Sequence, residues 1–317
     1  MTQGVAGSPW QSQTIESPTG AKLNCFSVHP AEPPKAVIHI NHGMAEHAAR
    51  YERFADALIQ NGYAVYAHDH RGHGKTTAKD APKGSFGPSG IEAVVDDVLA
   101  TRAEAAAAHP EAPFVLFGHS MGAIITFNTL LKHADKFAAG AVWNSGFETG
   151  ALALVFRGLL RIEQAFKGSD VPSGLATKLT FDDWNKKFAP NRTEFDWLSR
   201  DEAEVDKYVA DPDCGFPVSV GLWRAVLSAI YFGADDANLA ALPKAMPLHI
   251  TGGEKDPCTL NGKAMQNLHA RLKKAGMSDV TLSILANTRH ESLNEVNRDE
   301  TTAGFINWLD ERFGRQT

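Results

Sequence analysis

The chain has 317 residues, of which 43% are hydrophobic and 21% are charged, so it can bury a large core and has the composition of a globular protein. Its net charge of −6, without a basic stripe, excludes nucleic acid as an expected partner. Residues 1–10 lack the basic region and apolar run of a signal peptide, and the longest apolar window, 151–160, is too short to span a bilayer. Three unpatterned cysteines predict no disulfide framework, which fits a reducing, cytoplasmic location.

Strands and helices alternate along the first half of the chain. Two strands, 11–16 and 21–28, open it as a hairpin around a Ser-Pro-Thr-Gly turn. Buried strands are expected at 36–41, 63–68, 113–117 and 138–143. Between them lie amphipathic helices, one of which has apolar residues at 91, 94, 95, 98 and 99. This alternation predicts a largely parallel sheet with helices on both faces.

The alternation stops between Phe147 and Gly233, where helical pieces and loops contain nearly half of the chain's aromatic residues. This segment is either a helical subdomain with its own aromatic core or a lid whose underside lines an apolar pocket. Strands resume at 246–251 and 280–285, and a helix ends the chain. We therefore divide the chain into a core domain, 1–146 and 234–317, and a helical cap, 147–233.

The strand at 113–117 runs into Gly118-His119-Ser120-Met121-Gly122 and then directly into an apolar-periodic helix. A Gly-x-Ser-x-Gly turn between a strand and a helix is typical of a nucleophile elbow, which exposes a serine hydroxyl on a strained turn. Glycine is needed at 118 and 122 because side chains there would collide with neighbouring backbone. The sequence therefore predicts Ser120 as a nucleophile.

A serine hydroxyl needs a base to remove its proton and an acid to orient that base. In this type of sheet the acid and then the histidine follow the serine along the chain, each at the carboxyl end of a strand. Asp256 follows the strand at 246–251 and His290 follows the last strand, so both are expected at the edge that carries Ser120. Glu254 shares the loop of Asp256 but is less well placed.

Two backbone N–H groups are candidates for stabilising the oxyanion of acyl transfer. Met121 begins the helix after the nucleophile, where the helix dipole favours negative charge. Met44 follows His42-Gly43 in the loop after the third strand, and the glycine there allows a close backbone approach.

No metal and no nucleotide cofactor is predicted. The segment 72–76 ends like a phosphate-binding loop, but the leading glycine of that motif is replaced by Asp69. His290-Glu291 does not begin a zinc-binding helix, because position 294 is asparagine.

Together these segments resemble the α/β-hydrolase superfamily and, more narrowly, the monoacylglycerol lipase and lysophospholipase-like branch of serine hydrolases. The more specific signals are His42-Gly43-Met44-Ala45-Glu46-His47 and Asp69-x-Arg71-Gly72-His73-Gly74. The resemblance implies the α/β-hydrolase fold, with an eight-stranded, mostly parallel sheet flanked by helices and a helical cap inserted after the sixth strand. It also implies a cofactor-free ester hydrolase that acts through an acyl-enzyme.

The resemblance gives the triad and the two methionines the roles stated above, and Glu46 matches a loop-stabilising acidic position. Cys258 is read as a buried structural thiol or as a residue near the alcohol side of the pocket. The residues proposed to bind substrate are Gly43, Glu46, His119, Phe147, Phe181 and Trp184.

The expected partner is a small acyl ester or monoacyl lipid with a medium to long chain, and the cap is a candidate for transient contact with lipid surfaces. Its motifs look more like those of bacterial lysophospholipase-like hydrolases than of animal monoglyceride lipases, so the head group stays open, as does the oligomeric state. One alternative is a ligand receptor with slow, vestigial hydrolase activity. Another is an aminopeptidase of the same fold, which needs a cap carboxylate to hold a substrate ammonium. The carboxylates considered are Glu148, Glu163, Asp182, Asp183, Glu194 and Asp196.

Overall fold

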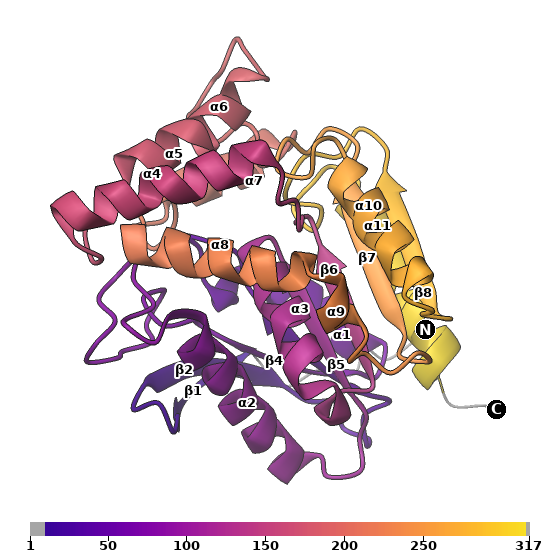
Figure 1. The fold of residues 1–317 in the computed structure, drawn as a ribbon. Helices are drawn as coiled ribbons and strands as arrows, with labels where there is room; N and C mark the ends of the chain where they lie inside the picture. The colour runs from indigo at the N-terminus through magenta and orange to yellow at the C-terminus, as the bar shows by residue number, and fades with distance from the viewer. Residues whose placement is uncertain (1–9, 315–317) are drawn as a thin grey trace.

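A computed structural model describes residues 10–314 of the protein (Figure 1). Residues 1–9, which belong to the segment expected not to be a signal peptide, lie outside the described range. The outer limits of the predicted core domain, residues 1 and 317, lie outside it too. One sheet has the strand order β1-β2-β4-β3-β5-β6-β7-β8. The strands are β1 (Gln11–Glu16), β2 (Lys22–Val28), β3 (Val37–Asn41), β4 (Ala64–His68), β5 (Phe114–His119), β6 (Ala139–Trp143), β7 (Leu248–Gly253) and β8 (Val280–Leu285).

Strands β1 and β2 pair antiparallel, and β2 also pairs antiparallel with β4. The remaining neighbours, from β4 through β3 to β8, are parallel, so their carboxyl ends share one edge of the sheet. The central strands β3 to β6 are buried along their whole length, which explains their nearly continuous apolar sequences. The predicted eight-stranded, mostly parallel sheet is confirmed.

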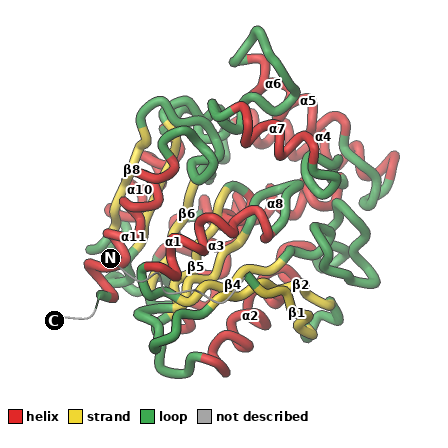
Figure 2. The backbone as a smooth tube through the Cα atoms, turned by 180° about the vertical axis from the view of Figure 1, so that it is seen from behind, coloured by secondary structure: helices red, strands yellow, loops and turns green. Residues whose placement is uncertain are grey.

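Helices cover both faces of this sheet (Figure 2). The helices α1 and α11 pack in one core cluster, and α2, α3, α8 and α10 pack in the other. The core helices are α1 (Glu52–Gln60), α2 (Gly90–Ala108), α3 (Met121–His133), α10 (Lys263–Lys274) and α11 (Arg298–Phe313). The predicted apolar stripe of α2 faces the second cluster, and Gly62, with φ +84°, follows the end of α1 as expected for a helix-terminating glycine.

The predicted cap, 147–233, falls between β6 and β7. The helices in this stretch are α4 (Ala151–Lys167), α5 (Gly174–Leu179), α6 (Phe181–Lys186), α7 (Glu202–Ala210) and α8 (Val220–Ala234), and a short helix, α9 (Asp236–Leu239), follows before β7. In Figure 1, α4 to α7 gather at the top of the molecule, with α8 between them and the core helices. Because Leu222 and Val226 of α8 belong to the same cluster as α2 and α3, this helix joins the cap to the core.

None of the helices within residues 10–314 combines the length and apolar character needed to cross a membrane.

Candidate active site

Ser120 lies in the sharp turn between β5 and α3, with φ +56° and ψ −119°, a conformation that residues other than glycine rarely adopt. The turn depends on its two glycines. A Cβ at Gly118 would overlap the carbonyl of Gly122, and a Cβ at Gly122 would overlap the carbonyl of Asn41. The Ser120 N–H donates to the Trp143 carbonyl at 2.9 Å, which anchors the strained turn to β6.

Three side chains from the carboxyl ends of β5, β7 and β8 meet at this turn. His290 Nε2 lies 2.9 Å from Ser120 Oγ, and His290 Nδ1 lies 3.0 Å from Asp256 Oδ1. Asp256 is completely buried and His290 is 2% exposed. With a proton on Nδ1 donated to the carboxylate, Nε2 is the nitrogen that accepts the serine proton. Glu254, the other acidic residue of this loop, instead accepts the N–H of Asn287.

Asp256 has two further hydrogen-bond donors. Its Oδ1 accepts the N–H of Cys258 at 2.9 Å, and its Oδ2 accepts the side-chain amide of Asn144 at 3.2 Å. The Asn144 carbonyl oxygen in turn accepts the hydroxyl of Ser292, two residues after His290, at 2.8 Å. Asn144 thus links the acid to the loop that carries the base. Sequence reasoning missed it, although its place directly after β6 puts it at the same edge.

The two predicted oxyanion donors border the cavity at Ser120. Met44 and Met121 both line a cavity that reaches this serine. Within residues 10–314, their backbone N–H groups donate to no protein acceptor, so both are available to a substrate oxygen. The neighbouring Gly43 N–H is occupied, because it donates to the Glu46 carboxylate.

One guanidinium joins residues 42–47, called the oxyanion loop here after the predicted role of Met44, to the loop that carries His290. Arg50 donates to Glu46 and makes two bonds, of 2.7 and 2.8 Å, to Glu291. Glu46 also accepts the Tyr51 hydroxyl at 2.9 Å. Burial alone would raise the pKa of Glu46, but Arg50 and His119 outweigh it and hold that pKa well below its usual range. Glu46 therefore stabilises the loop as a carboxylate.

His119 precedes Ser120 and contacts both loops. Its Nδ1 is 3.6 Å from Glu46 Oε1, and its Nε2 is 3.0 Å from the carbonyl oxygen of His290. Burial alone would lower the pKa of His119, but the nearby carboxylate of Glu46 raises it above its ordinary value. His119 is thus a cationic bridge between the two loops below that pKa.

Five buried histidines lie together beneath the oxyanion loop: His39, His42, His68, His70 and His73. Burial lowers the pKa of each of them, to about 3 for His42 and His73 and to about 4 for His68. His42 Nε2 accepts the backbone N–H of His70 at 2.9 Å, so Nδ1 carries the proton and donates to the Gly43 carbonyl at 2.8 Å. These neutral rings support the loop.

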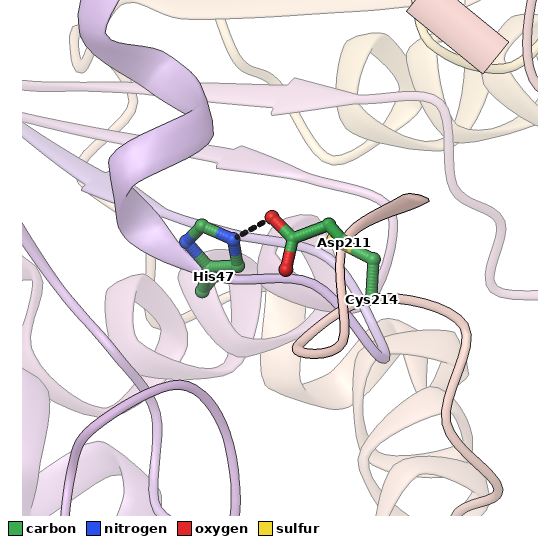
Figure 3. Close-up of side chains that lie close together, drawn as sticks. All are labelled: His47, Asp211 and Cys214. Carbon is green, nitrogen blue, oxygen red and sulfur yellow. Dashed lines mark hydrogen bonds and ion pairs between the residues drawn. The ribbon is translucent and has the colours of Figure 1, made fainter. Parts of the chain in front are cut away.

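The group of side chains in Figure 3 lies where the oxyanion loop meets the cap. His47 Nε2 is 2.8 Å from Asp211 Oδ2, and Cys214 lies beside the pair. Their ligand atoms all lie within 4.8 Å of one another, a spacing that suits a metal ion. Asp256, Cys258 and His290 are equally close, but two of these already form the hydrogen-bonded chain to Ser120.

Backbone contacts strengthen this connection between cap and core. The Ala45 carbonyl accepts the Gly215 N–H at 2.9 Å and the Tyr208 hydroxyl at 3.0 Å. The Tyr208 ring also lies 4.8 Å from the Arg50 guanidinium. The loop after α7 is therefore attached to the segment that presents the Met44 N–H.

Two cavities open on Ser120. The first, of about 310 Å³, is mostly apolar and includes Met121, Ile124, Trp223 and Leu227 in its lining. The second, of about 220 Å³, is more polar, and both His290 and His119 line it. Met44, Ser120 and Phe181 line both, so the cavities meet at the reacting group.

Of the three aromatic residues proposed to bind substrate, two border a cavity at Ser120 and one packs in the core. Phe181 borders both cavities and Trp184 borders the apolar one. Phe147 instead packs in the core against Phe127, with ring centroids 4.7 Å apart, because α8 leaves space for it beside Gly233. Its placement is that of a packing residue.

The other candidates divide between the same cavities. Gly43, Glu46 and His119 border the polar cavity, and Cys258 borders the apolar one. Trp197, which sequence reasoning did not single out, borders the polar cavity with its ring centroid 4.8 Å from that of His290. The many aromatic residues of 147–233 indicate that this segment lines a pocket, but they do not single out Trp197.

The cap carboxylates occupy four kinds of position. Glu163 and Asp196 are buried and satisfied locally, by Ser173 and by Thr193 respectively. Glu148 borders the apolar cavity and accepts an Asn267 amide. Asp183 is exposed on α6. Asp182 and Glu194 border the polar cavity.

Comparisons with known proteins agree with this architecture. The family model described as serine aminopeptidase, S33 (Hydrolase_4) matches residues 32–297. The chain is 27% identical over 281 residues to the monoacylglycerol lipase of Mycolicibacterium smegmatis, covering 88% of this chain and 90% of that protein. It is 28% identical over 190 residues to the monoglyceride lipase homolog of Monkeypox virus, covering 60% of each, so it spans less than two thirds of that relative.

Solved structures share the fold. A thermostable carboxyl esterase from Bacillus coagulans, in complex with glycerol, superposes with a TM-score of 0.88 at 22% identity, over 96% of this chain and 99% of that one. A structure described as a lipase in its open form gives a TM-score of 0.84 at 26% identity over the same shares. The family resemblance drawn from the sequence is confirmed: the chain is an α/β hydrolase and belongs to the serine aminopeptidase S33 (Hydrolase_4) family.

Proposed function

We propose that the protein is a serine carboxylic ester hydrolase of the monoacylglycerol lipase or carboxylesterase kind. The observation that carries this proposal is the hydrogen-bonded chain Ser120–His290–Asp256 beside the unoccupied N–H groups of Met44 and Met121. The monoacylglycerol lipase and lipase relatives support the same activity.

In the proposed mechanism, Ser120 Oγ attacks the ester carbonyl while His290 Nε2 takes the hydroxyl proton. The Met44 and Met121 N–H groups donate to the oxyanion, and buried Asp256 stabilises the imidazolium. His290 then returns the proton to the alcohol oxygen as the ester C–O bond breaks, which leaves an acyl-serine. Water, deprotonated by the same histidine, then adds to the acyl carbon. The bond from that carbon to Ser120 Oγ breaks as His290 returns the proton to Oγ, which releases the acid and the free serine.

The two cavities receive the two halves of the ester in this mechanism. The histidine must reach the oxygen of the leaving alcohol, and His290 borders only the polar cavity of the two. We therefore assign the polar cavity to the alcohol and the apolar cavity to the acyl chain. The volume and lining of the apolar cavity support medium to long chains.

The family description makes peptide amides the second substrate class to test. An aminopeptidase substrate carries its ammonium on the acyl side of the scissile bond. On that side the cap carboxylate bordering the cavity is Glu148, which is exposed and bonded to Asn267. Asp182 and Glu194 instead border the proposed alcohol side. This distribution favours esters.

Contact of the cap with lipid surfaces is part of the proposal. One face of α4 presents Leu152, Val155, Ile162 and Phe166, spaced like successive turns of a helix and exposed by 86%, 59%, 58% and 86%. The buried residues of α4 are Leu160, which belongs to the larger core cluster, and Glu163. An apolar stripe on a surface helix is typical of interfacial binding.

The test is a nitrophenyl-ester series of increasing acyl length, assayed beside aminoacyl nitroanilides on wild type and Ser120→Ala. We expect hydrolysis of esters with a preference for medium or longer chains, little amide cleavage, and loss of turnover in the variant. Undiminished ester turnover by Ser120→Ala, or faster cleavage of the nitroanilides, would overturn the proposal.

A further inference from the structure

We propose that the alcohol cavity selects esters whose leaving alcohol carries an ammonium group, which Asp182 and Glu194 recognise. This proposal rests on the proposed ester hydrolysis and specifies that the leaving alcohol is positively charged. These two residues then act as specificity determinants of the same reaction.

The lining of this cavity is mainly negative, and its one histidine with a raised pKa, His119, already faces Glu46. Four carboxylates border it, those of Glu46, Asp182, Glu194 and Glu291, whereas among residues 10–314 no lysine or arginine does. Glu46 and Glu291 share the buried Arg50 behind the wall. The charges left for a ligand are those of Asp182 and Glu194.

Both of these side chains lack a cationic partner. Among the described residues, neither forms an ion pair, even though Lys178 and Lys186 lie four positions to either side of Asp182 on the cap helices. Arg192, near Glu194 in the chain, is already bound to Asp206. The two carboxylates therefore present uncompensated negative charge at a cavity that reaches Ser120.

Aromatic rings complete the cavity wall beside the carboxylates. Phe195 and Trp197 border it together with Tyr208 and Phe216. The last two already face cations, since Arg50 lies 4.8 Å from the Tyr208 ring and Lys83 lies 4.7 Å from the Phe216 ring. The Trp197 ring is already stacked on Phe181, with centroids 5.4 Å apart, and lies 4.8 Å from the His290 ring. Phe195 remains as a ring for an alkylammonium group, which aromatic rings attract through their quadrupole.

Other leaving groups match this wall less well. An anionic alcohol, such as a phosphodiester, would place negative charge beside Asp182 and Glu194. A neutral alcohol of the same shape would leave both carboxylates without a counter-charge. A cationic alcohol satisfies the carboxylates and the Phe195 ring together.

The experiment compares a choline ester with the 3,3-dimethylbutyl ester of the same medium-chain acid, because these alcohols share a shape and differ in charge. The quantity measured is the ratio of their kcat/KM values in wild type and in Asp182→Asn/Glu194→Gln. Comparing this ratio between proteins cancels the intrinsic reactivity of the choline ester. Asp183→Asn is the matched control, since Asp183 is exposed on the same helix and outside the cavity lining.

We expect the cationic-to-neutral ratio to fall by about five- to tenfold in the double variant, mainly through KM of the choline ester, and to stay unchanged in Asp183→Asn. Added salt should reduce the preference of the wild type, because both carboxylates are exposed. Free choline should inhibit the wild type more strongly than the double variant.

An unchanged ratio in the double variant, or an equal fall in Asp183→Asn, would overturn the assignment of the ammonium site while the neutral ester still reports hydrolysis. Failure of the wild type on both esters would overturn the proposed ester hydrolysis itself.

Discussion

Asn144 acts on the site through position rather than through reaction chemistry. Its amide donates to Asp256 and its carbonyl oxygen accepts from Ser292, so it fixes the acid relative to the loop of His290. We expect Asn144→Ala to lower kcat by about tenfold with little change in KM, because an unsatisfied buried carboxylate oxygen costs about 1–3 kcal/mol. Steady-state kinetics on one nitrophenyl ester measure this.

A second variant separates the lost hydrogen bond from backbone strain. Asn144 has φ +52°, a conformation that asparagine tolerates better than alanine and that glycine adopts freely. Asn144→Gly should therefore keep more of the thermal stability than Asn144→Ala while losing as much kcat. Recovery of wild-type kcat in the glycine variant would show that strain, rather than the amide, explains the loss.

The triad candidates could be named from the sequence because topology fixes where they lie. Parallel strands share their direction, so residues that follow β5, β7 and β8 must gather at one edge. The same rule places Asn144 at this edge, directly after β6, but it does not show that the amide bonds to Asp256. Trp197 follows no such rule, because it reaches His290 only through the folding of the cap segment. Contacts of this kind need the three-dimensional packing.

Arg50 shows how one residue couples two loops. Arg50→Met would leave the carboxylates of Glu46 and Glu291 buried without a counter-charge, so we expect a loss of about 3–5 kcal/mol in unfolding free energy. The matched control is Arg53→Met, for which we expect about 0–1 kcal/mol, because this arginine is 43% exposed and its partner Glu204 keeps a second ion pair with Lys207. Urea unfolding measures both.

The stability difference between wild type and Arg50→Met should depend on pH in a definite direction. In the wild type Arg50 helps to hold the pKa of Glu46 well below its usual value, so the stabilisation is present above the unfolded pKa and lost as pH falls through the folded one. Without Arg50, burial raises that pKa and the neutral acid is tolerated. The difference between wild type and Arg50→Met should therefore shrink in acid; a constant difference would contradict the ion-pair explanation.

At the scale of elements, helix α4 presents an apolar stripe to solvent. Replacing Leu152, Ile162 and Phe166 with glutamine should weaken binding to phospholipid vesicles by about tenfold or more, since each apolar side chain contributes about 1 kcal/mol or more when it leaves water. Hydrolysis of a short, water-soluble ester should not change. Vesicle co-sedimentation and a soluble-ester assay measure the two effects.

Val296→Asn is the matched control, because this valine is 57% exposed but lies on the core domain. Equal losses in the control and in the α4 variant would indicate nonspecific hydrophobic adsorption rather than an oriented cap.

Local pattern determines the elements, and long-range pairing determines their arrangement. The apolar runs predict all eight strands, and each observed limit lies within two residues of the predicted one. The spacing of residues 91, 94, 95 and 98 predicts helix α2. The crossing order β2-β4-β3-β5 and the outward stripe of α4 were not predictable, because periodicity identifies an apolar face without showing what covers it.

At the scale of the whole molecule, the buried histidines make stability depend on pH. Burial lowers the pKa of His39, His42, His68, His70 and His73 below 6.5 in the folded protein, whereas the unfolded chain protonates them normally. Below about pH 6.5 the unfolded state therefore binds more protons, and the free energy of unfolding falls as pH falls.

His68→Gln tests this pH dependence. The quantity compared is the slope of the unfolding free energy against pH, rather than the unfolding free energy at one pH. The pKa of His68 is lowered to about 4, so between about pH 6 and about pH 5 it contributes up to about 1.4 kcal/mol per pH unit to the slope. The variant should lose about that much slope in urea-unfolding experiments, whatever its absolute stability. His269→Gln, on the partly exposed side of α10, is the control for replacing a histidine with glutamine outside this buried group. If His68→Gln kept the wild-type slope, the ring would have to be protonated within the folded core, which would contradict its neutral role beneath the oxyanion loop.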